Sequence, residues 1–178
     1  SSVSRARNIL NVADIIIDYY LKNFGTETNV VVSALGIQSG GNKKAKVTDR
    51  LLGVATHVYA SNPTAALEEI EWLKNKHYSV INDLTLSGTK VNREIVNATL
   101  DEIARKAAID IRNGLQINEA QLKDSIAGLG ELLSTPIVAE AVQRKLEHKF
   151  RILEERLRTS GLSEAERGIY EHLKSCNG

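Results

Sequence analysis

Cysteine, proline, methionine and aromatic residues are scarce in this chain. Its 178 residues include one cysteine, two prolines and no methionine, and aromatic residues make up 4% of the total. The single cysteine, Cys176, has no partner for an intrachain disulfide, which is typical of proteins in a reducing compartment. We therefore expect the protein to be cytoplasmic.

An excess of charge of one sign is also lacking. Lysine and arginine number 23, aspartate and glutamate number 22, and the formal net charge is +1. Nucleic-acid binding needs a basic face, so we expect no nucleic-acid partner. The apolar runs are too short to cross a bilayer, and the first residues lack the basic and apolar regions of a secretory signal. We therefore expect no membrane association.

The remaining composition is that of a soluble globular protein. Hydrophobic residues make up 42% of the chain and charged residues 25%. A chain of this length buries roughly two-thirds of the surface that it exposes when unfolded, which is enough for a hydrophobic core. We expect one folded domain.

The first half of the sequence indicates an α/β protein. Apolar residues at helical spacing predict a helix over residues 4–24, with Ser4 as its N-cap. The valine-rich residues 29–34 follow, and a short run of this kind is typical of a buried parallel strand. A helix that leads into a buried strand favours an α/β fold, rich in helices, with few parallel strands.

Helices dominate the rest of the sequence. Thr48 is the expected N-cap of one helix, and Asn62 with Pro63 opens a second that continues to about residue 84. Residues 163–166 carry a capping-box pattern that predicts a short last helix. Three further helices are expected over residues 91–113, 118–133 and 136–159.

A loop rich in glycine and lysine follows the expected strand and is a candidate anion site. Gly40, Gly41 and Lys43 are its candidate contacts, because a glycine loop between a strand and a helix N-terminus exposes backbone N–H groups. Gly36 and Gly41 have the spacing of a nucleotide-binding P-loop, but Asn42 stands where that motif requires lysine. A solvated surface loop is the alternative.

Neither a metal site nor a catalytic nucleophile is expected. The histidines His57, His77, His148 and His172 lie on four different expected helices, which does not make a metal-ligand set. The sequence has no G-x-S-x-G elbow, and Cys176 lies near the end of the chain, so nothing indicates nucleophilic catalysis.

Two glycines interrupt a helical pattern at residues 128–134. Each glycine inside a helix costs about 1 kcal/mol, so another group must approach this backbone closely. One interpretation is tight packing against a neighbouring helix, with Glu131 facing solvent. The other is that Glu131 has a functional role, and this pattern by itself does not decide between them.

Three motifs, in order, resemble the aspartate kinase family. Ser2-Val3 followed by residues 11–16 is similar to the end of the family's K-F-G-G-T-S-V signature and the helix after it. Residues 30–34 resemble its V-V-x-S-A strand, and residues 48–52 its T-x-L-L helix start. Residues 122–135 contain a G-E-x-x-S pattern that resembles another helix of the family. Together the motifs extend over about residues 1–145.

The resemblance implies a partial amino-acid kinase domain over residues 1–145, with a helical insertion at about residues 62–133. The implied reaction transfers the ATP γ-phosphate to the β-carboxylate of L-aspartate, with Mg²⁺. Matched by motif, Ser33 and Thr48 would contact aspartate, and Glu131 would bind its ammonium group. A carboxylate suits an ammonium group, and hydroxyls near helix N-terminal amides suit a carboxylate.

Departures from the family pattern predict that the chain by itself is inactive. The K-F-G-G part of the signature is missing, so the residues that would bind ATP and Mg²⁺ are not present. We therefore expect a fragment or an inactive homologue that retains part of the aspartate site.

The resemblance ends near residue 143, and residues 146–178 form an expected helical tail. An apolar stripe in this region favours self-association as a homodimer, although such stripes more often pack on their own domain. The alternative function is accordingly a helical regulatory subunit that self-associates without catalysis. The stripe consists of Val142, Leu146, Phe150, Leu153 and Leu157.

Overall fold

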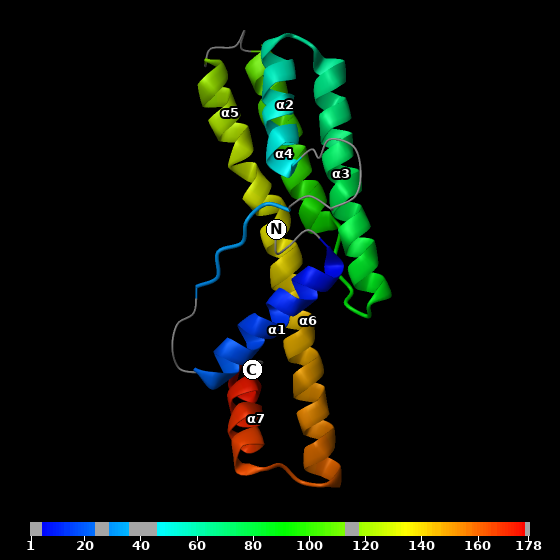
Figure 1. The fold of residues 1–178 in the computed structure, drawn as a ribbon, viewed down its shortest axis with the longest axis vertical. Coiled ribbons are helices and arrows are strands. Elements are labelled where there is room, and N and C mark those ends of the chain that lie inside the picture. The colour runs from blue at the N-terminus through cyan, green and yellow to red at the C-terminus, as the bar shows by residue number, and fades with distance from the viewer. Residues whose placement is uncertain (1–4, 24–28, 36–45, 113–117, 177–178) are drawn as a thin grey trace.

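The computed structural model describes residues 5–23, 29–35, 46–112 and 118–176, and these residues form seven α-helices (Figure 1). The helices are α1 (Ala6–Lys22), α2 (Val47–Tyr59), α3 (Pro63–Leu86), α4 (Glu94–Arg112), α5 (Glu119–Ala127), α6 (Leu129–Thr159) and α7 (Glu164–Cys176).

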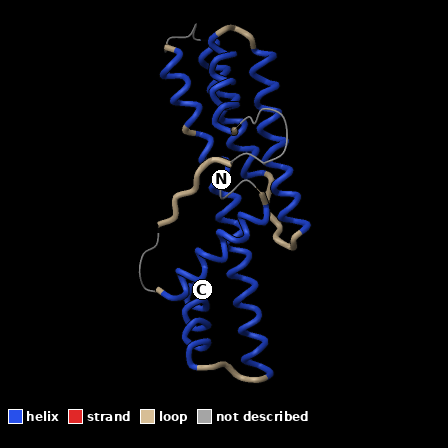
Figure 2. The backbone as a smooth tube through the Cα atoms, in the orientation of Figure 1, coloured by secondary structure: helices blue, strands red, loops and turns tan. Residues whose placement is uncertain are grey.

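The prediction of an α/β fold with few parallel strands is wrong, because the described residues contain no β-strand (Figure 2). Residues 29–35, which include the expected buried strand, form an extended segment that pairs with no other strand in the described chain. Val31 is 93% exposed. Valine favours extended backbone, but a strand requires a neighbouring strand for its backbone hydrogen bonds, and the surrounding elements are helices.

Several helix boundaries follow local capping chemistry. The Asn62 side chain accepts a hydrogen bond from the Ala65 N–H at 3.2 Å, with Pro63 as the first residue of α3, as predicted. The Ser163 and Glu166 side chains each accept a bond from the other residue's backbone N–H, which confirms the capping box before α7.

Other predicted boundaries are wrong. Thr48 is the second residue of α2 and not its N-cap, since α2 begins at Val47. Pro136 lies inside α6, where the helix was expected to begin, because α6 already starts at Leu129. Helix α6 is therefore a single element of 31 residues.

Helix α6 connects the two ends of an elongated molecule. Its first half packs with α2, α3, α4 and α5, and α1 crosses it near its middle (Figure 1). The main core fills this end of the molecule and includes fully buried Leu51, Leu73, Ile103 and Leu133. Segment 29–35 reaches this core through Leu35.

A second core cluster occupies the other end, where α7 folds back against α6. Gly161, with φ of 78°, follows α6 and allows the reversal that few side-chain-bearing residues tolerate. The cluster joins α1, α6 and α7, and the Phe150 and Tyr170 rings stack at 5.3 Å. Its buried residues are Ile17, Leu21, Leu153, Tyr170 and Leu173.

The apolar stripe of the tail belongs largely to this second cluster. Leu153 is buried in it, and Val142, Leu146 and Phe150 pack at its edge against α1 and α7. Leu157 is the member of the stripe that remains exposed. Most of the stripe is therefore covered within the chain, and self-association stays a prediction.

One continuous helical run, Glu119–Thr159, is long and apolar enough to cross a membrane by length and composition. Its best window has a mean hydropathy of 1.2, and 44% of that window is buried inside the protein. Core helices of soluble proteins pass the same test. The cytoplasmic location and the lack of membrane association stay predictions.

Candidate functional site at the start of α6

Three segments that are distant in sequence meet at Gly130 in the first turn of α6. A Cβ atom placed on Gly130 would lie 2.7 Å from Leu51 Cδ1, 3.5 Å from Ala34 Cβ and 3.9 Å from Val47 Cγ1. No side chain fits at the first of these distances without movement of Leu51. The glycine therefore permits close approach of α2 to α6, in agreement with the tight-packing interpretation of this segment.

Ser134 fixes the extended segment to α6. Its hydroxyl donates a hydrogen bond to the Ser33 backbone carbonyl at 2.8 Å and lies 3.2 Å from the carbonyl of Glu131. Ser134 is fully buried. Buried polar groups are costly unless they are hydrogen-bonded, so this contact holds the Ser33 backbone at a defined place beside α6.

The three residues predicted to contact aspartate are next to this junction in sequence. Ser33, Thr48 and Glu131 are the immediate sequence neighbours of Ala34, Val47 and Gly130, whose contacts define it. All three are exposed, and their side chains make no hydrogen bond or ion pair with a described residue. The structure thus brings together three short segments and leaves each candidate side chain accessible to a ligand.

The other predicted contacts fall elsewhere in the chain. Gly40, Gly41 and Lys43, the candidate anion-contacting loop, lie outside the described residues. Ser134 appeared in the sequence as part of a motif, but its hydrogen-bond partner 101 residues away was not predictable.

The N-terminus of α2 contributes backbone donors near Thr48. The N–H groups of Val47 and Thr48 have no acceptor among the described residues. The free N–H groups and the dipole of a helix N-terminus favour a carboxylate. The Asp49 side chain accepts a bond from the Lys46 N–H at 3.3 Å, so one negative charge already lies at this helix end.

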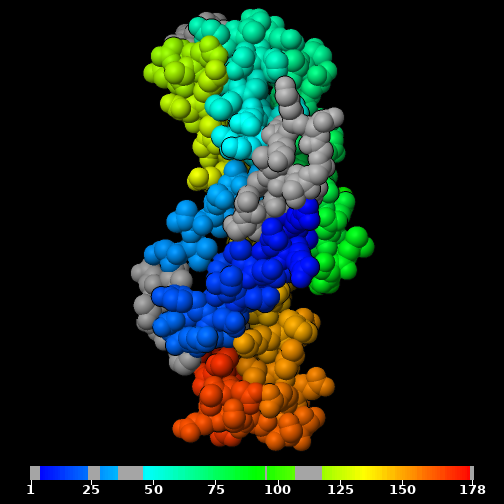
Figure 3. Space-filling view, viewed as in Figure 1, coloured from blue at the N-terminus to red at the C-terminus, as the bar shows by residue number. Residues whose placement is uncertain are grey.

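A hollow of about 330 Å³ lies between α1, α6 and segment 29–35, which share one face of the molecule (Figure 3). Its lining is Ile16, Val30, Val32, Thr135, Val138, Ala139, Val142, Gln143 and Leu146. The lining contains no cation to balance a triphosphate and no carboxylate to hold a magnesium ion. These residues do not fit ATP with Mg²⁺, and no phosphoryl-transfer step follows from them.

The side chain of Arg50, which is also on α2, contacts residues of α3. Its Nη1 donates to Glu69 Oε2 at 2.8 Å, and its guanidinium lies 4.8 Å from the centre of the Trp72 ring. His57 Nε2 is 3.9 Å from the same carboxylate. These contacts link α2 to α3 and place the Arg50 charge in an internal ion pair, with the Nε atom buried without a hydrogen-bond partner.

A second polar cluster joins α1 to α7. The Tyr20 hydroxyl lies 2.8 Å from His172 Nε2 and 3.6 Å from Cys176 Sγ. The hydrogen bond with Cys176, together with burial, raises the pKa of Tyr20 above its usual value. The four-residue spacing of His172 and Cys176 is readable in the sequence, whereas the approach of Tyr20 depends on the fold.

Among the described residues, no group of three or more His, Cys, Asp or Glu side chains is arranged to hold a metal ion. No protein-family model, no curated protein and no solved structure matches this chain. The relationship to aspartate kinases therefore stays a prediction that rests on the sequence motifs.

Proposed function

We propose that this protein is aspartate kinase-like and binds L-aspartate at the junction of α6, α2 and segment 29–35. The observation that supports the proposal most strongly is the convergence at Gly130. Residues of segments 30–34, 48–52 and 122–135, which carry two of the three motifs, meet there, and each segment has one exposed candidate residue next to the junction in sequence.

The chemistry of the junction is complementary to an amino acid with two carboxylates. Glu131 supplies the negative charge that an α-ammonium group requires. Ser33 and Thr48 supply hydroxyl donors for carboxylate oxygens, and the N–H groups at the start of α2, which have no acceptor among the described residues, add to the attraction.

The proposal concerns binding and leaves phosphoryl transfer aside. The hollow beside the junction has no cation for ATP phosphates and no carboxylate for magnesium in its lining. We expect no aspartate-dependent release of ADP from this chain, in a coupled assay with ATP and Mg²⁺. Aspartate-dependent turnover would contradict that expectation and would leave the binding site itself intact.

Titration of the isotope-labelled chain with L-aspartate, followed by NMR, tests the binding site. Glu131→Gln keeps the shape of the side chain and removes its charge. A charge-assisted hydrogen bond contributes about 1.5–3 kcal/mol, and the exposure of Glu131 favours the lower end of this range. We expect aspartate affinity to fall by about tenfold.

Two controls separate a specific contact from a general charge effect. Glu155→Gln removes the same charge from an exposed position near the other end of α6 and should leave aspartate affinity unchanged. Succinate, which lacks the ammonium group, should bind Glu131→Gln protein at least as tightly as wild-type protein, because the negative charge of Glu131 repels it. The proposal fails if aspartate does not bind at high millimolar concentration, or if both glutamate variants weaken it to the same extent.

A further inference from the structure

A second cavity, remote from the aspartate junction, lies between the turn after α3 and the middle of α6. Its volume is about 690 Å³, which is within the usual range for small-molecule sites. The lining residues are Ser87, Gly88, Thr89, Lys90, Arg144, Lys145, Glu147, His148 and Arg151.

The lining of this cavity is strongly basic, although the whole chain carries a formal charge of only +1. Lys90, Arg144, Lys145 and Arg151 line it together with one carboxylate, that of Glu147. Three of these cations lie within residues 144–151 of α6, and the fold adds Lys90 from the turn after α3. Such a cavity attracts anions.

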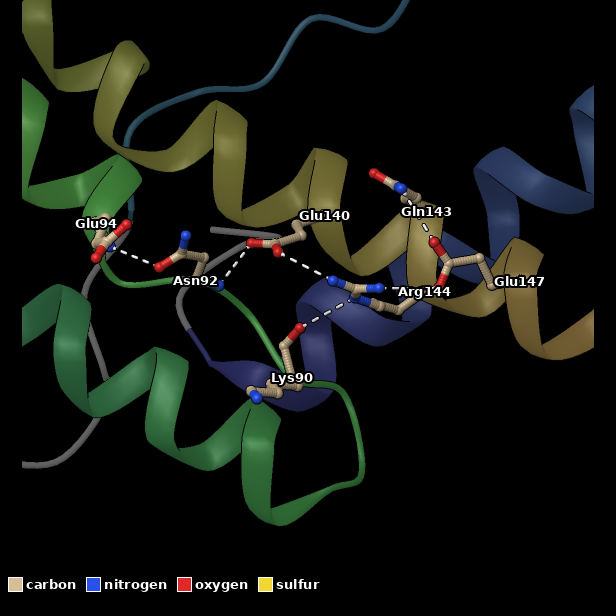
Figure 4. A network of polar contacts seen from close by, with 7 residues as sticks. All are labelled: Lys90, Asn92, Glu94, Glu140, Gln143, Arg144 and Glu147. Atoms are coloured by element: carbon tan, nitrogen blue, oxygen red, sulfur yellow. Dashed lines mark hydrogen bonds and ion pairs between the residues drawn. The ribbon is translucent and has the colours of Figure 1, made fainter. Parts of the chain in front are cut away.

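Acidic neighbours hold Arg144 in a fixed orientation at the cavity wall (Figure 4). Its Nη1 lies 3.0 Å from Glu147 Oε2, its Nη2 lies 3.6 Å from Glu140 Oε1, and its Nε donates to the Lys90 carbonyl at 3.4 Å. The Asn92 N–H also donates to Glu140, at 2.7 Å. Arg144 therefore shapes the cavity, while its charge is largely balanced.

Lys145 is balanced in the same way, by an ion pair with Asp14 of α1. Lys90 and Arg151 differ, because neither lies within ion-pair distance of a described carboxylate. The pKa of Glu147 is lowered mainly by its hydrogen bond with Arg144, and the Arg151 charge contributes to the same shift. Thr89 is only 7% exposed, and its hydroxyl makes no hydrogen bond within the described chain. Two cations outside ion-pair distance and a hydroxyl without a described partner thus line one cavity, with the exposed His148 beside them.

We propose that this cavity binds the phosphate group of a small phosphorylated molecule. Phosphate carries up to two negative charges and several acceptor oxygens, so it can bind Lys90, Arg151 and the Thr89 hydroxyl together. A single carboxylate has one charge and two oxygens, and it satisfies fewer of these groups. The cavity is bounded by one turn and one helix, and its volume suits a compact ligand.

The phosphate site is independent of the proposed aspartate site. Arg144 follows Glu131 by 13 residues in the same helix, so the two positions are separated by about 20 Å along the helix axis. Failure of one proposal therefore leaves the other in place.

Titration of the ¹⁵N-labelled chain with inorganic phosphate, and separately with glycerol 3-phosphate, tests the proposal. We expect amide shifts at residues 87–90 and 144–151 that saturate at millimolar ligand. The double variant Lys90→Ala with Arg151→Ala should bind about tenfold more weakly, because two cations that line the cavity are lost. Both side chains are exposed, and an unchanged thermal transition will show that the fold is retained.

Arg158→Ala is the matched control, since Arg158 is an exposed arginine on the same helix and does not line the cavity. It should leave phosphate affinity unchanged. If inorganic phosphate and glycerol 3-phosphate bind equally, the phosphate group alone is recognised. If glycerol 3-phosphate binds more tightly, the cavity also contacts its glycerol part. Either result supports the phosphate site. The proposal is wrong if neither ligand shifts these amides at tens of millimolar, or if Arg158→Ala weakens binding as much as the double variant.

Discussion

The buried hydroxyl of Ser134 donates a hydrogen bond to the backbone carbonyl of Ser33, 101 residues earlier in the chain. This bond is a direct polar contact between the extended segment 29–35 and α6. Valine side chains alone position such a segment poorly, because hydrophobic contacts are non-directional. The hydrogen bond adds direction and sets the place of Ser33 relative to Glu131.

Ser134→Ala should destabilise the protein and weaken the contact between segment 29–35 and α6. The net contribution of such a hydrogen bond is about 1 kcal/mol, and the cost rises to about 1–3 kcal/mol if the Ser33 carbonyl stays buried without a partner. Urea denaturation measures the loss. Amide hydrogen exchange in residues 32–35 should become faster, since the segment loses its polar anchor.

Thr135→Ala is the control for Ser134→Ala. Thr135 is exposed, and its hydroxyl donates only to the Glu131 carbonyl within its own helix, at 2.8 Å. Its removal should change the free energy of unfolding by less than about 0.5 kcal/mol. Similar losses for the two variants would show that Ser134 contributes as a generic helix residue and not through Ser33.

Two glycine substitutions in helices should have opposite effects on stability. Gly130→Ala would bring a methyl group within 2.7 Å of Leu51 Cδ1, and Leu51 is fully buried. Overpacking costs about 1–3 kcal/mol, which exceeds the gain of about 1 kcal/mol in helix propensity. Gly168→Ala in α7 meets nothing within 4 Å, so only the gain remains.

Thermal denaturation of the two alanine variants measures this contrast. We expect the transition temperature of Gly130→Ala to fall and that of Gly168→Ala to rise. A rise for both would mean that Leu51 moves aside at little cost. The close approach at Gly130 would then not constrain the junction of α2 with α6.

Local signals predicted much of the helical structure but not its assembly. Asn62 with Pro63 and the Ser163–Glu166 pair act within one helical turn, so their effects are readable in sequence. A strand differs, because its formation depends on a partner distant in the chain. Residues 29–35 adopt the extended backbone that valine favours. The α/β prediction is wrong because no described strand pairs with this segment.

Part of the candidate site was predictable, because one of its features also depends on a local signal. The glycine at position 130 signalled a close approach because it is costly inside a helix, although the sequence did not show that Leu51 is the neighbour. The basic cavity gave only a partial local signal, the cations of residues 144–151. Lys90 and Arg151 are 61 residues apart, and only the packing of the α3–α4 turn against α6 places them around one space.

His77 should make the stability of the protein sensitive to mildly acidic pH. The ring is fully buried, and its Nδ1 lies 2.6 Å from the Leu73 carbonyl, so Nδ1 carries the proton. Nε2 is buried without a partner, and a second proton there would place an unbalanced charge in the core. Burial lowers the pKa of His77 from 6.5 to about 4.

This lowered pKa of His77 fixes the direction of the pH effect. Between pH 6.5 and pH 4 the unfolded chain binds a proton at His77 that the folded chain does not bind, so the free energy of unfolding falls as the pH falls. The lowered pKa of His77 corresponds to about 3 kcal/mol of folding stability, which is present above pH 6.5 and is lost as the pH falls towards 4.

Urea denaturation of wild-type and His77→Leu protein across this pH range isolates the contribution of His77, because the carboxylates titrate in both proteins. The variant should lose less stability on acidification. Parallel curves for wild-type and His77→Leu protein would mean that water or a rearranged partner reaches Nε2 and that His77 is not held neutral by burial.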